Sequence, residues 1–99
     1  MIIVAGTISV DPTDFEAYRA AAGAMIDATL TEDGCETYNF AQSVVDPTEV
    51  RIFEVWQSRE HLETHFRAPH METFRAALGE LKIGDRNLAI YQADKVADL

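Results

Sequence analysis

The sequence predicts an α+β fold of the ferredoxin-like type, in which a split β-α-β sheet carries its helices on one face. Strand-like alternation of apolar residues occurs at 2–10, 35–45, 50–57 and 86–96. Helical periodicity occurs between the first two strands and again between the last two. The resulting order is β-α-β-β-α-β. No linker, repeat or low-complexity segment interrupts it, so residues 1–99 are expected to form a single domain.

The first strand and first helix are separated by an Asp-Pro pair. Strand 2–10 is rich in β-branched residues and ends at Asp11. Asp11 is a favourable helix N-cap, and Pro12 suits the first helical position. Gly34 marks the expected end of this helix. The apolar residues between these points recur at helical spacing: Phe15, Tyr18, Ala22, Met25, Ile26.

The middle of the chain predicts a hairpin followed by a divided helix. Residues 35–45 and 50–57 alternate on either side of the turn sequence Asp-Pro-Thr-Glu, which indicates an antiparallel hairpin. Ser58 can cap the next helical region. Pro69 divides that region into two pieces, and Gly84 is expected to end the second piece before the last strand, 86–96.

Strands that are apolar on both faces predict a self-associating protein. By alternation, Val4 and Ile8 share one face of strand 2–10, while Phe53 and Val55 share one face of strand 50–57. Two helices can cover only one face of the sheet. We expect these four residues to lie on the helix-free face, where an uncovered apolar surface marks an interaction site. A second copy of the chain is the economical cover, so we expect a homodimer.

Composition and charge exclude several classes of protein. Eight Lys and Arg against seventeen Asp and Glu give a net charge of −9, without a basic cluster for nucleic-acid phosphates. The apolar N-terminal segment lacks a basic signal-peptide start and is too short to span a bilayer. The single cysteine, Cys35, cannot form an internal disulfide, which suits a reducing compartment. We expect a cytoplasmic protein with no nucleic-acid or membrane partner.

Three segments in register resemble the antibiotic biosynthesis monooxygenase (ABM) domain: MIIVAGTISVDP, EDGCETYNF and FEVWQSREHLETHFRAPHMETF. The resemblance covers nearly the whole chain and implies a dimeric α+β barrel. It does not specify an activity, because the family includes cofactor-independent monooxygenases of quinols and polycyclic phenols, an isomerase branch acting on phosphorylated sugars, and haem-degrading members. The haem-degrading pattern is absent, since Thr7, His65 and Arg75 stand where that branch has Asn, Trp and the iron-binding His.

All three histidines lie in the segment HLETHFRAPH, residues 61–70. His61 and His65 are four residues apart, but the Glu of the H-E-x-x-H zinc motif is missing and no further ligands stand at a recognisable spacing. We therefore expect no metal site. Relative to the apolar stripe of Leu62 and Phe66, His61 is expected in solvent and His65 at the boundary between core and water. His70 is expected to cap or pack against the next helix.

The resemblance makes His65 the candidate catalytic base, because this position faces the cleft between helices and sheet in such folds. A histidine has a suitable pKa without tuning. Its alternative role is a structural hydrogen bond. The role of Glu54 is left open, although a buried carboxylate needs a partner. Candidate residues for binding a ring-shaped substrate in this cleft are Thr7, Tyr38, Trp56, Phe66 and Phe74.

The leading functional hypothesis, implied by the resemblance, is a cofactor-independent monooxygenase that oxidises a quinol or polycyclic phenol with O₂. No G-x-G-x-x-G or P-loop motif is present to hold a flavin or nicotinamide nucleotide, so no cofactor is expected. Two alternatives stay open. One is an isomerase of a small phosphorylated hydroxyketone, which needs Lys82, Arg86 and Arg75 to converge on the cleft. The other is a non-catalytic dimeric binding or stress-response module, with His65 held in a structural hydrogen bond.

Overall fold

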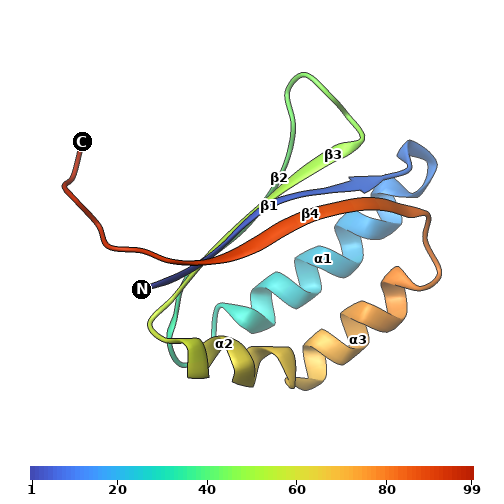
Figure 1. Cartoon of the computed structure of the whole chain (residues 1–99). Coiled ribbons are helices and arrows are strands. Elements are labelled where there is room, and N and C mark those ends of the chain that lie inside the picture. Colours follow the sequence, from blue (N-terminus) through green and yellow to red (C-terminus); the bar gives the residue numbers. More distant parts are fainter.

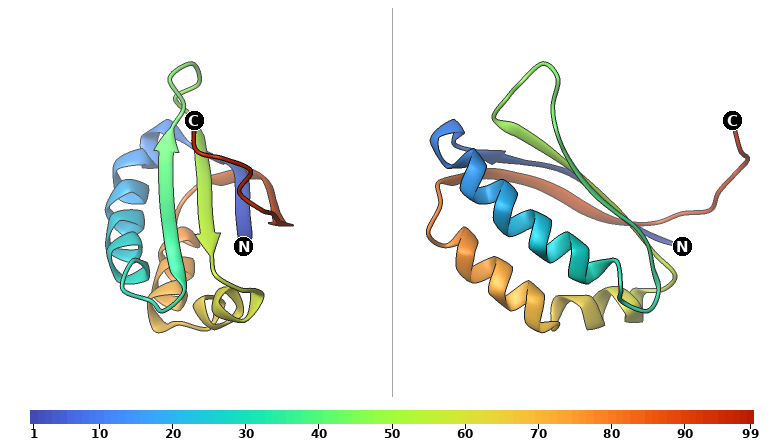
Figure 2. Two further views of the ribbon diagram at one scale, coloured as in Figure 1. Left: turned by 90° about the vertical axis from the view of Figure 1, so that its left-hand side faces the viewer. Right: turned by 180° about the vertical axis from the view of Figure 1, so that it is seen from behind.

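The computed structural model describes all 99 residues and confirms the ferredoxin-like α+β fold. One antiparallel sheet has the strand order β2-β3-β1-β4, and all helices lie on one of its faces (Figure 1). Helices α1 and α3 pack side by side beneath the strands, and the C-terminal segment extends away from the body (Figure 2). None of the helices has the length and apolar character needed to cross a membrane. The elements are β1 (Ile2–Val10), a 3-10 turn η1 (Pro12–Asp14), α1 (Phe15–Thr29), β2 (Cys35–Gln42), β3 (Glu49–Trp56), α2 (Arg59–Phe66), α3 (Pro69–Leu78) and β4 (Ile83–Gln92).

Two of the expected helix ends are wrong. Helix α1 ends at Thr29, and Gly34, with φ +81°, instead lies in the turn that enters β2. Helix α3 ends at Leu78 with Gly79 as its C-cap, and Gly84 lies within β4. Both helices stop before the predicted glycine, which serves the turn or strand that follows.

The strands also differ from expectation at their ends. Strand β2 ends at Gln42, and Val44 and Val45, expected in the strand, are exposed in the loop before β3. Strand β4 spans 83–92 rather than 86–96. Asp11 caps the 3-10 turn η1 rather than α1, since its carboxylate accepts a hydrogen bond from the Thr13 N–H at 2.9 Å, whereas Asp14, at the N-cap of α1, makes no side-chain cap hydrogen bond.

The register of β1 against β3 places the core on the helix-bearing face. Val4 pairs with Glu54 and Ile8 pairs with Val50. Val4 is 7% exposed and Ile8 is 5% exposed, and both belong to the apolar cluster that packs under the helices. Their expected place on the helix-free face is therefore wrong. Alternation separates the two faces of each strand, but only the register tells which face of β1 continues which face of β3.

The helix-free face nevertheless carries an apolar row. Ile3 pairs with Val55 and Ala5 pairs with Phe53, so these side chains share that face. Tyr91 extends the row on β4 opposite Ile3. Phe53 is 45% exposed and Tyr91 is 53% exposed in the single chain. Val55 shares this face but is only 9% exposed in the single chain. We propose that a second copy of the chain covers this face, with Phe53 rather than Val4 and Ile8 at the contact.

Candidate active site

A cavity of about 560 Å³ lies between the helix-bearing face of the sheet and helices α1 and α3. Its lining is mostly hydrophobic, and its size is typical of sites that bind a small organic molecule. Three of the predicted substrate-binding residues, Tyr38, Phe66 and Phe74, line it together. The charged or ionisable lining residues are Tyr18, Glu54, Arg75 and Arg86, along with Tyr38.

The other two predicted substrate-binding residues lie outside this cavity. Trp56 is fully buried behind it, with its ring centroid 4.8 Å from that of His65 and 6.2 Å from that of Tyr38. The Trp56 indole N–H donates a hydrogen bond to Glu54 Oε1 at 3.0 Å, so Trp56 positions a cavity residue. Strand alternation places Thr7 on the helix-free face, away from the cavity.

His65 is buried rather than at the boundary of the core. The His65 side chain is 1% exposed. Helical spacing alone places one side of it at the boundary with solvent, but strand β2 and the turn before β2 cover that side. Its Nε2 is 3.1 Å from the Tyr38 hydroxyl, and its Nδ1 is 2.6 Å from Glu32 Oε2. A carboxylate only accepts hydrogen bonds, so Nδ1 carries the proton and Nε2 accepts from Tyr38. This arrangement assigns the tautomer and the orientation of the imidazole.

Glu32 extends the hydrogen bonds to the protein surface. His70 Nε2 donates to the same Glu32 oxygen at 2.8 Å. The side chains of Glu32 and His70 are 14% and 24% exposed. His70, expected to cap or pack, therefore has a polar partner in a chain that we call the Tyr38–His65–Glu32–His70 chain. Such a chain links a residue that lines the cavity to solvent and can move a proton between them.

Burial shifts the pKa values of the ionisable groups at the cavity. It lowers the pKa of His65, against the opposing effects of the hydrogen bond and charge of Glu32, and favours the neutral imidazole. Burial and the charge of Glu54 raise the pKa of the Tyr38 phenol. Burial also raises the pKa of Glu54 to about 7, opposed by the Trp56 hydrogen bond. Glu54 is thus a cavity group that changes protonation near neutral pH.

Three side chains lie close enough together to hold a metal ion. The ligand atoms of Glu32, His65 and His70 are within 4.8 Å of one another. The sequence suggested only His61 with His65, because Glu32 is 33 residues before His65. His61 lies near this cluster but outside it, with its Nδ1 2.7 Å from Ser58 Oγ and its Nε2 3.4 Å from Asp33 Oδ2. Its side chain is 31% exposed, which is less than expected. In this structure the Glu32 carboxylate accepts a hydrogen bond from each of the two imidazoles.

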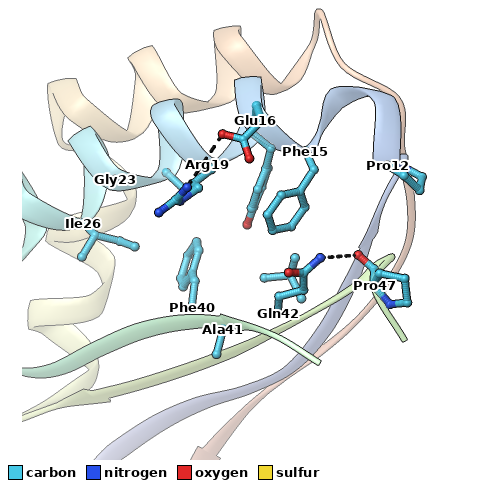
Figure 3. Close-up of a pocket in the computed structure, with 13 residues that line it drawn as sticks. Pro12, Phe15, Glu16, Arg19, Gly23, Ile26, Phe40, Ala41, Gln42 and Pro47 are labelled. Atoms are coloured by element: carbon cyan, nitrogen blue, oxygen red, sulfur yellow. Dashed lines mark hydrogen bonds and ion pairs between the residues drawn. The ribbon is translucent and has the colours of Figure 1, made fainter. Parts of the chain in front are cut away.

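A second cavity, of about 720 Å³, lies between α1 and the β2–β3 hairpin. Phe15 and Phe40 approach each other across it from the helix and the sheet (Figure 3). Its charged groups are the exposed pair Arg19 and Glu16, 3.8 Å apart. Its lining contains no histidine or cysteine, so this cavity offers a surface for binding rather than a base with a pKa near neutrality.

Comparison with known proteins decides the family. The model of the family described as "Antibiotic biosynthesis monooxygenase" matches residues 1–77. The chain belongs to the antibiotic biosynthesis monooxygenase family. The resemblance carried by the three sequence segments is therefore confirmed.

Two relatives are similar to this chain over most of its length. The chain is 41% identical over 70 residues to "Putative monooxygenase Rv0793" of Mycobacterium tuberculosis, covering 71% of this chain and 68% of that protein. It is 31% identical over 91 residues to "Uncharacterized protein sll1783" of Synechocystis, covering 92% of this chain but 62% of that longer protein.

Solved structures extend the ABM likeness to the whole fold. The structure of Rv0793 superposes with a TM-score of 0.82 at 31% identity, covering 97% of this chain and 98% of that one. A Deinococcus radiodurans structure described as a "putative antibiotic biosynthesis monooxygenase" gives a TM-score of 0.91 at 26% identity, covering 100% and 98%. These names indicate an oxidoreductase class for the relatives.

Proposed function

We propose that this ABM protein is a cofactor-independent monooxygenase that oxidises a quinol or polycyclic phenol with O₂. The Tyr38–His65–Glu32–His70 chain carries the proposal, because it connects a tyrosine lining an apolar cavity to a neutral imidazole and a carboxylate. A phenol must lose its proton before it can reduce O₂, and this chain supplies the acceptor.

His65 acts as the base through Tyr38 rather than by touching the substrate, since it is 1% exposed and does not line the cavity. The substrate phenol donates its proton to the Tyr38 oxygen while Tyr38 passes its own proton to His65 Nε2. The imidazolium that forms lies against the Glu32 carboxylate at 2.6 Å, which stabilises the charge. The same carboxylate holds His65 in the accepting tautomer beforehand.

The substrate itself supplies the electrons for O₂. One-electron transfer from the phenolate gives a substrate radical and superoxide, and their recombination forms a C–O bond. Protonation gives a hydroperoxide; loss of the ring C–H proton and cleavage of the O–O bond then release water and leave a quinone carbonyl. Overall, the phenol and O₂ become a quinone and water. Glu54, which lines the cavity with a pKa of about 7, is the proton donor to the departing oxygen.

Oxygen uptake tests this proposal. The metal-stripped protein is incubated with a panel of quinols and hydroxynaphthalenes, and we expect uptake above the buffer rate with at least one of them. Tyr38→Phe and His65→Ala should each lower that rate by about 10²–10⁴. His61→Ala is the matched control and should keep the wild-type rate. Circular dichroism checks that the His65 variant folds, because that side chain is buried. No uptake with any substrate, or full activity in Tyr38→Phe, would refute the proposal.

A second candidate is the isomerisation of a small phosphorylated hydroxyketone. Arg75 and Arg86 both line the cavity, as a phosphate-binding site requires, whereas Lys82 does not. Arg75 also donates a hydrogen bond to the Phe66 carbonyl oxygen at 2.7 Å. Turnover of a phosphorylated hydroxyketone under nitrogen would favour this isomerase. The open cavity weighs against a binding module with a filled cleft.

A further inference from the structure

Tyr18 carries a buried hydroxyl that has no partner in the protein. Tyr18 is on α1, is 2% exposed and lines the cavity of about 560 Å³. Its ring packs against Phe74 at a centroid distance of 6.2 Å. Every other fully buried side-chain nitrogen or oxygen has a hydrogen-bond partner. An unpaired buried hydroxyl destabilises a protein, so a Tyr rather than a Phe at this position calls for an explanation. A hydrogen bond to a bound molecule provides one.

Arg86 brings a positive charge to the same cavity. It stands opposite Ile8 on β4, which places it on the helix-bearing face, and it lines the cavity. Arg86 is exposed, and no ion pair or hydrogen bond joins its guanidinium to another side chain, so it is free to contact a ligand. Tyr18 and Arg86 both line this cavity. Burial raises the pKa of the Tyr18 phenol, and the charge of Arg86 opposes that rise.

Arg86 lies away from the acid–base groups Tyr38 and Glu54 along the sheet. Across the sheet, Tyr38 and Val4 both pair with Glu54, whereas Arg86 pairs with Ile8. Val4 and Ile8 are four residues apart on β1, which corresponds to about 13 Å along a strand. Tyr38 on β2 and Arg86 on β4 are also three strand spacings apart, which adds about 14 Å across the sheet. Because both side chains are long and line the cavity, the gap between their polar ends is shorter than this backbone separation, and a ligand of two or three fused rings can lie between them with an oxygen group at each end.

We propose that Tyr18 and Arg86 form a carboxylate-binding subsite, and that the ligand is an aromatic acid with its phenol and its carboxylate at opposite ends. The guanidinium and the Tyr18 hydroxyl donate charge-assisted hydrogen bonds to the carboxylate. A neutral phenol leaves both donors unpaired and binds more weakly. The orientation of the phenol toward Tyr38 rests on the proposed function, but binding of the carboxylate does not.

Titration calorimetry under nitrogen tests the subsite with a matched pair of probes. The first is 6-hydroxy-2-naphthoic acid, and the second is 2-naphthol, which has the same rings and phenol without the carboxylate. We expect the acid to bind about tenfold or more tightly than the naphthol. Arg86→Gln and Tyr18→Phe should each weaken the acid about tenfold and leave the naphthol unchanged. Arg51→Gln, which removes one positive charge on the opposite face of the sheet, should change neither.

Tyr18→Phe has a second readout that separates ligand binding from structure. Because the hydroxyl is unpaired in the free protein, the variant should have the same melting temperature as the wild type or one several degrees higher. A lower melting temperature would show that the hydroxyl is structural and would overturn its role. Equal binding of the two probes by the wild type, or unchanged acid binding in both variants, would overturn the subsite. Since O₂ is absent, a failed oxygen-uptake assay counts against the proposed function alone.

Discussion

Relative to the wild type, Glu54→Gln should become more stable as the pH rises from about 4 to about 8. Glu54 is 6% exposed, and burial raises the pKa of its carboxyl from 4.5 to about 7. The Trp56 indole N–H, at 3.0 Å, is its one side-chain hydrogen bond. Glutamine keeps an oxygen that can accept this bond and has no proton to lose. Any cost of burying the amide NH₂ is the same at every pH, so the pH dependence is the informative quantity.

The sign and size follow from proton linkage. The folded protein holds the Glu54 proton more tightly than the unfolded chain, so this group stabilises the fold most below pH 4.5. That contribution is lost as the pH rises through about 7. At 1.36 kcal/mol for each tenfold change in proton affinity, the two pKa values correspond to roughly 3 kcal/mol. The wild type should therefore lose on the order of 3 kcal/mol relative to Glu54→Gln between about pH 4 and pH 8.

Urea unfolding at several pH values measures this difference. Trp56 is the only tryptophan and is fully buried, so its fluorescence reports unfolding of the site directly. When the free energy of unfolding of the wild type is subtracted from that of the variant, the contributions of the titratable groups that both proteins share cancel. Glu36→Gln, at an exposed carboxyl on β2, is the matched control and should give a constant difference. The reasoning would be refuted if the difference in free energy of unfolding between Glu54→Gln and the wild type did not change with pH. It would also be refuted if that difference favoured the variant less at pH 8 than at pH 5.

Phe53→Lys should convert the proposed homodimer to monomers, because it places an unpaired charge on the helix-free face; sedimentation velocity that still shows a dimer would exclude this contact. Dialysis against EDTA should leave oxygen uptake and melting temperature unchanged, whereas a loss restored by zinc would identify a metal site. Gly34→Ala should lower the free energy of unfolding by at least about 1 kcal/mol, since φ is +81° and the Cβ would lie 2.2 Å from the His61 ring. Gly23→Ala in α1, with open space around it, should raise it by about 0.5–1 kcal/mol in the same urea titration.

Much of the architecture is determined by signals that act over a few residues. Alternation and helical spacing predict the order of strands and helices, and Asp11 and Ser58 cap helical turns where the sequence places them. The aromatic lining could also be predicted in part. Tyr38 and Phe74 occupy apolar positions of periodic segments that must face the core, and both reach the cavity.

The tertiary structure alone decided how these segments meet. Val4 joins the core because the β1–β3 register matches its face with that of Glu54, and a register is set by packing across the whole sheet. His65 is buried because Tyr38 and Glu32 approach it from other elements, which helical spacing in α2 cannot anticipate. The same packing leaves the Tyr18 hydroxyl without a partner. Contacts between residues distant in the chain depend on the assembled core, so the acid–base chain and the cavity emerge only once the helices lie on the sheet.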